Sequence, residues 1–74
     1  MKTLYYTVEK QTTNLDGIEE CTGWKTISVY EIVLDKPKLW FELDANNEDS
    51  SEDEIQEWLD SNGFEDREYE FERL

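Results

Sequence analysis

The chain has 74 residues, of which 20 are acidic and seven are basic, so its formal net charge is −13. This length predicts a single small domain spanning residues 1–74, which buries only about 60% of the surface that its unfolded chain exposes. Three Trp, four Tyr and three Phe are too much bulky apolar surface for a disordered acidic tail. Direct binding to nucleic acid or to an anionic membrane is disfavoured, because both require Lys and Arg.

The negative charge is concentrated in the C-terminal part of the chain. Residues 1–43 contain seven acids and five Lys, and residues 44–74 contain thirteen acids and two Arg. Cys21 is the single cysteine, so an internal disulfide is excluded and a reducing compartment is favoured. No apolar signal segment or run of 18 apolar residues is present. We therefore expect a cytoplasmic protein, of a cell or of an infected host.

Two strands are predicted in the first half of the chain. Residues 2–10 alternate between apolar and polar side chains, and residues 23–35 are rich in β-branched and aromatic residues. The dipeptide Asp16-Gly17 between them is typical of a type I′ hairpin turn. This turn predicts that Tyr6 faces Ile27 and that Leu4 faces Val29. The polar stretch between them, residues 11–22, either continues the hairpin or forms a loop.

A second hairpin is predicted around Pro37, which can occupy a turn but not the middle of a central strand. A four-residue loop would place Leu34 opposite Leu39, Ile32 opposite Phe41 and Tyr30 opposite Leu43. The apolar positions of the middle strand change parity at residues 29–30. This change predicts a bulge or a sharp twist there, although burial of both faces would also explain it.

An amphipathic helix follows. Ser51 and Glu54 have the spacing of a capping box, and acids in the first turn suit the positive end of the helix dipole. Ile55, Trp58 and Leu59 form one apolar stripe. Asn62-Gly63 predicts a left-handed end to the helix, after which Phe64 packs on Leu59 in a Schellman motif.

The last segment, residues 67–74, alternates again, with Tyr69 and Phe71 on one side and Glu68, Glu70 and Glu72 on the other. The predicted order is β-β-β-α-β, an α+β domain with a mostly antiparallel sheet and one helix packed on one face. A right-handed crossover would place the last strand parallel to the first, giving the spatial order 3-2-1-4.

Catalysis is not indicated by any motif. The chain contains no His, no Gly-rich phosphate loop, no Cys/His metal cluster and no nucleophile elbow. An EF-hand beginning at Asp44 would need Gly at its sixth position and Glu at its twelfth, where the chain has Asp49 and Ile55. We therefore expect no enzyme activity, no cofactor and no dedicated metal site.

The acids are more numerous than helix dipole compensation requires. Two explanations remain open: the acids maintain solubility, or they form a binding surface for a basic partner, such as a nucleic-acid-binding enzyme. The second explanation predicts a partner-binding surface at Asp49, Asp53, Glu57, Asp60, Glu68, Glu70 and Glu72. Regularly spaced carboxylates on this surface would imitate a nucleic-acid backbone. In size and charge the chain resembles the nucleic-acid mimics that phages encode, such as anti-restriction and anti-CRISPR proteins.

The aromatic residues suggest an alternative function. Tyr5, Trp24 and Trp40 fall on the faces opposite the nearest apolar residues of their strands. We expect them to cover the second face of the sheet, whereas a solvent-facing cluster would mark a partner site. The alternative is thus a structural or assembly module, such as a virion component or a homo-oligomer, that associates through an aromatic face or a sheet edge.

Overall fold

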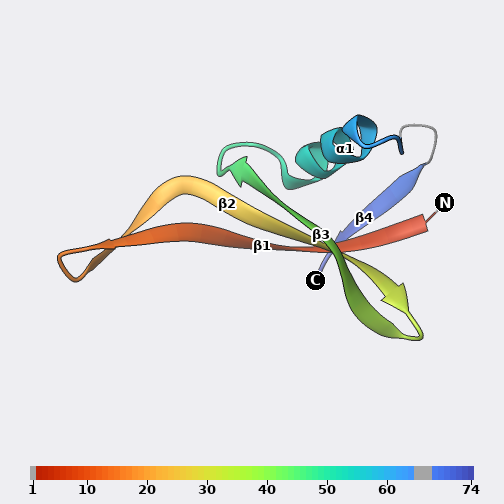
Figure 1. Cartoon of the computed structure of the whole chain (residues 1–74), viewed down its shortest axis with the longest axis horizontal. Helices are drawn as coiled ribbons and strands as arrows, with labels where there is room; N and C mark the ends of the chain where they lie inside the picture. Colours follow the sequence, from red (N-terminus) through yellow and green to blue (C-terminus); the bar gives the residue numbers. More distant parts are fainter. Residues whose placement is uncertain (1, 65–67) are drawn as a thin grey trace.

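Four strands and one helix make up the computed structural model, which describes residues 2–64 and 68–74. The elements in chain order are β1 (Lys2–Leu15), β2 (Ile18–Val33), β3 (Lys36–Asn46), α1 (Ser51–Ser61) and β4 (Tyr69–Arg73). They form one sheet in the order β3-β2-β1-β4 (Figure 1). β4 runs parallel to β1, and the other neighbours are antiparallel. The predicted α+β class, element order and strand order are confirmed.

The first hairpin turns where the sequence predicts. Asp16 and Gly17 both have positive φ, 52° and 81°, and Leu15 pairs with Ile18. Further from the turn the register shifts by two residues, so Tyr6 pairs with Val29 instead of Ile27. The predicted pairs were wrong because β2 contains a bulge between residues 21 and 25, but an even shift leaves each side chain on its predicted face.

The polar stretch 11–22 continues this hairpin on both sides of the turn. Residues 12–24 are exposed at every position, so this part of the hairpin extends as an arm beyond the core (Figure 1). The arm contributes to the elongated shape of the molecule, which measures 47 × 26 × 16 Å.

The second hairpin is tighter than predicted. Leu34 and Asp35 form a two-residue turn with φ values of 52° and 63°, so Ile32 pairs with Pro37. The predicted four-residue loop was wrong. Leu-Asp is not a typical dipeptide for two positive φ angles, so the sequence did not indicate the two-residue turn that forms here. A bulge lies at the level of residues 29–30 as predicted, but its extra residue is Trp40 on β3 and not a residue of the middle strand.

The position of Trp40 differs from the prediction. Its ring lies on the α1 side of the sheet, 5.2 Å from the ring of Phe64 and 6.1 Å from that of Trp58. The bulge interrupts the alternation of side chains along β3, and this interruption brings Trp40 to the buried side. Trp40 therefore belongs to the helix–sheet interface.

The helix docks as its apolar stripe predicts. Ile55 and Leu59 are fully buried, and the ring of Trp58 stacks on that of Phe41 at 3.6 Å between centroids. At the end of the helix, Gly63 has φ +87° and the Phe64 amide donates to the Leu59 carbonyl at 2.9 Å. The Schellman-type helix end is confirmed.

The helix start is not the predicted capping box. Ser50 is the N-cap residue and makes no side-chain capping hydrogen bond, and Ser51 is already helical. Glu52, Asp53 and Glu54 occupy the first turn as predicted. The helix start therefore relies on the interaction of these acids with the helix dipole.

A single core lies between α1 and one face of the sheet. The fully buried side chains of the sheet are Leu4, Ile27 and Val29, which face Ile55 and Leu59 of the helix. In Figure 1, α1 lies on one side of the sheet, and no other helix or strand of the described residues covers the opposite face. The sheet consequently has one buried and one open face. Its free edges are β3, β4 and the part of β1 that lies beyond its pairing with β4.

Candidate functional site

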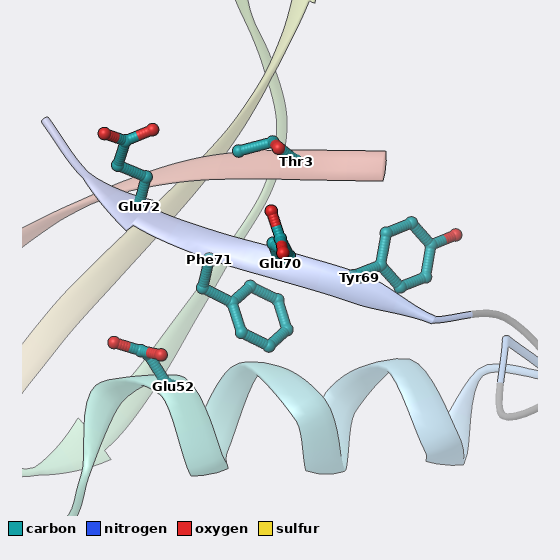
Figure 2. Close-up of a pocket in the computed structure, with 6 residues that line it drawn as sticks. All are labelled: Thr3, Glu52, Tyr69, Glu70, Phe71 and Glu72. Atoms are coloured by element: carbon teal, nitrogen blue, oxygen red, sulfur yellow. The ribbon is translucent and has the colours of Figure 1, made fainter. Parts of the chain in front are cut away.

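A depression of about 560 Å³ surrounds the free edge of β4. Its walls come from three elements, and the lining residues are Thr3, Glu52, Tyr69, Glu70, Phe71 and Glu72. Figure 2 shows that Glu70 and Glu72 project from β4 away from α1, whereas Phe71 projects toward it. The depression thus reaches both faces of this strand and combines aromatic rings with three carboxylates.

Glu52 is held toward the sheet by a tyrosine. The Tyr6 hydroxyl donates a hydrogen bond to Glu52 Oε2 at 3.2 Å. Burial, this hydrogen bond and the charge of Glu52 raise the pKa of Tyr6, while the nearby charge of Arg73 acts in the opposite direction. Glu52 is therefore a lining residue of the depression as well as a helix-start acid.

A second, smaller depression of about 250 Å³ lies on the other flank of the helix, between α1 and β3. Its lining residues are Leu43, Asp44, Glu54, Glu57, Trp58 and Ser61. Partial burial raises the pKa of Glu54, and so do the neighbouring carboxylates of Glu57 and Asp49, whereas Lys25 lowers it. This flank of the helix is acidic and has an aromatic wall, like the flank beside β4.

One cation, Lys25, lies close enough to Glu54 of the second depression to lower the pKa of that carboxyl. Lys25 is buried, and its Nζ donates a hydrogen bond to the backbone carbonyl of Asp49. This contact fixes the loop that precedes α1 against the sheet. The charge of Lys25 only partly offsets the repulsion at Glu54, because the pKa of Glu54 remains raised.

Removing the charge of Glu54 should stabilise the fold at neutral pH. A carboxyl whose folded pKa lies above its unfolded pKa destabilises the fold when both states are ionised, and this cost disappears below the unfolded pKa. Glu54→Gln should therefore raise the melting temperature at pH 7 and have little effect near pH 3. Thermal denaturation of both proteins at the two pH values tests this expectation. An equal shift at both values would show that the gain does not come from the charge.

The structure separates the seven predicted binding residues into groups. Glu70 and Glu72 line the first depression, and Glu57 lines the second. Asp53 and Asp60 are exposed on α1, Asp49 lies exposed in the loop before the helix, and Glu68 is exposed just before β4. Glu70 and Glu72 lie on the face of the sheet opposite α1. The predicted acids thus occupy both sides of the sheet.

Sequence reasoning missed three carboxylates and three aromatic residues of these depressions. Glu52 and Glu54 were explained by the helix dipole alone, and Asp44 was considered only as a metal ligand. Trp58 was placed in the apolar stripe of the helix, and Tyr69 and Phe71 were placed only on one side of the last strand. The missing signal was the docking position of α1, which brings its first turn beside β1 and β4.

Protein-family models, curated protein sequences and solved structures were compared with this chain. None of them matches it. In the described part of the chain, no His, Cys, Asp and Glu side chains are grouped to hold a metal ion, and no helix has the length and apolar character needed to span a membrane.

Proposed function

We propose that this protein is a small non-enzymatic binding protein whose acidic surface engages a basic protein, such as a nucleic-acid-binding enzyme, at the surface where that enzyme holds nucleic acid. The observation that carries the proposal is uncompensated charge. Residues 2–64 and 68–74 contain one ion pair, between Lys2 Nζ and Glu31 Oε1 at 2.9 Å. No other described carboxylate forms an ion pair with a described Lys or Arg, and the carboxylates that accept hydrogen bonds from neutral side chains keep their charge.

Two further observations support a binding surface. Ordinary solubility needs a net charge of magnitude about 2–8, and this chain carries −13. Carboxylates such as Glu54 repel one another at a cost to the fold. The carboxylates also lie beside aromatic rings in two depressions, and aromatic rings with adjacent carboxylates suit Lys and Arg side chains through cation–π and ionic contacts.

Salt dependence tests the proposal. The purified protein should capture a basic nucleic-acid-binding protein from lysate at about 0.1 M salt and release it at about 0.5 M, where screening is much stronger. Free DNA should displace the captured protein, because the two compete for one surface. Capture that resists both salt and DNA would contradict the proposal.

An assembly role is the second candidate, and the open face of the sheet favours it. Ile32 and Leu39 on this face are 45% and 47% exposed. Leu39, Tyr30 and Tyr5 are register neighbours on three adjacent strands, so their side chains form one patch with Ile32. Burial of this apolar patch between copies would persist or strengthen at high salt. Light scattering after size exclusion at low and high salt distinguishes the two roles: a salt-resistant oligomer supports assembly, and a monomer at both salt concentrations opposes it.

A further inference from the structure

The free edge of β4 differs from the other open edges of the sheet in its charge. We propose that an extended, basic segment of the partner protein pairs with this edge as a fifth strand. This inference rests on the proposed function, because it assumes a basic partner, and it adds the place and the conformation of the bound segment.

The backbone of β4 has amide and carbonyl groups on the side away from β1. The Leu74 amide donates to the Tyr6 carbonyl at 2.9 Å, and Arg73 is the register partner of Tyr6. In a parallel ladder the groups of alternate residues point to the same side. The amides and carbonyls of Tyr69, Phe71 and Arg73 therefore point away from β1, toward the free edge. Unpaired groups of this kind are the template for strand addition.

The side chains around this edge select the chemistry of the added strand. Successive residues of a strand point to opposite faces, so an added strand would direct its side chains alternately to the two sides of β4. On the open face it would meet Glu70 and Glu72, and on the α1 side it would meet Glu52 beside the Phe71 ring. Lys or Arg would satisfy both sides, since their apolar stems cover a ring while the charge reaches a carboxylate.

The other free edges of the sheet are protected by features that β4 lacks. β3 begins with Lys36, Pro37 and Lys38 and has its bulge at Trp40, and β1 carries Lys10 beyond the end of β4. Lysine, proline and bulges are among the protections against edge pairing, together with short strands and other charged side chains. The β4 edge is instead flanked by glutamates, which repel a second copy of this acidic chain and attract a basic strand.

The size of the edge sets the size of the bound segment. β4 has five residues, which corresponds to about 17 Å of extended strand. Arg73 lies at its C-terminal end, where its charge acts on Tyr6. Cationic side chains of the added segment should therefore lie beside Glu70 and Glu72, away from this end.

Amide hydrogen exchange by NMR tests the pairing directly. The probe is a short capped peptide of alternating lysine and valine. Its control is the same peptide with a methyl group on every backbone nitrogen, which keeps the charge but removes the donors and sterically blocks the close approach of a paired strand. The lysine–valine peptide should protect the Phe71 and Arg73 amides from exchange, and the methylated peptide should not. Fast exchange of these amides in the peptide-saturated protein would overturn edge pairing and leave electrostatic binding intact. A lack of any binding at low salt would overturn both proposals.

Charge-matched variants locate the binding of the same peptide. Glu70→Gln with Glu72→Gln removes two charges at the edge, and Glu19→Gln with Glu20→Gln removes two charges in the exposed hairpin arm. The edge variant should weaken peptide binding about tenfold, and the arm variant less than about twofold. Equal losses would show that the peptide responds only to net charge, which would overturn the edge as its site.

Discussion

Leu59→Ala is expected to remove about 2–5 kcal/mol from the free energy of unfolding, as large-to-small substitutions in a core do. Leu59 is fully buried and is one of two such residues on α1, with Ile55. A 74-residue domain has a total stability of about 4–11 kcal/mol. The substitution should therefore remove a large part of the free energy of unfolding and increase the fraction of unfolded molecules at 25 °C.

Urea denaturation followed by tryptophan fluorescence measures this loss. Trp58 stacks on Phe41 between the helix and the sheet, so its emission should report the separation of α1 from the sheet. Ser61→Ala is the matched control, because Ser61 is exposed in the last turn of the same helix and should change stability by less than about 0.5 kcal/mol. Equal effects of the two substitutions would contradict the docking of α1 through its apolar stripe.

Local patterns in the sequence predicted most of the fold. The alternation in residues 2–10 and 69–73 reflects strands that bury one face. The spacing of Ile55, Trp58 and Leu59 reflects a helix that also buries one face. Asp16-Gly17 marked its turn because this dipeptide accepts positive φ angles. The general preference for right-handed crossovers predicted β4 beside β1, where the structure has it.

Features that depend on strand registry and packing were not predictable in the same way. The turn at Leu34 and Asp35 places a leucine at positive φ, which is uncommon for a residue of this type, so local preference indicated a longer loop. The bulge near Gly23 changed the pairing by two residues, a shift that alternation cannot detect. Trp40 reached the buried side only because the bulge lies at that residue.

The same distinction applies to the candidate site. Glu70 and Glu72 could be recognised because they alternate with partly buried aromatic residues on one strand. Glu52 could not, because its place in the first depression depends on the hydrogen bond from Tyr6, which is 46 positions away in the sequence. The site is formed by the docking of α1 across the sheet, and sequence patterns within single elements do not encode it.

Reversing three carboxylates that line the depressions should weaken binding of the captured basic partner about 100-fold. The variant combines Glu57→Lys, Glu70→Lys and Glu72→Lys, and each reversal replaces an attraction by a repulsion, at about 1 kcal/mol each. The control reverses Glu9, Glu19 and Glu20, which are exposed on β1 and β2. Both variants have a net charge of −7, since three reversals add six charges to −13, and circular dichroism verifies that each is folded.

Polylysine, used as a second ligand, separates the local effect from the effect of net charge. A flexible polycation responds mainly to the total field of the protein, so its affinity should fall by similar amounts in the two variants. A partner that is held at the depressions contacts particular carboxylates, so its affinity should fall strongly in the first variant and little in the second. If the partner instead behaves as polylysine does, the acidic surface acts through its net charge alone, and the depressions beside α1 are not the binding site.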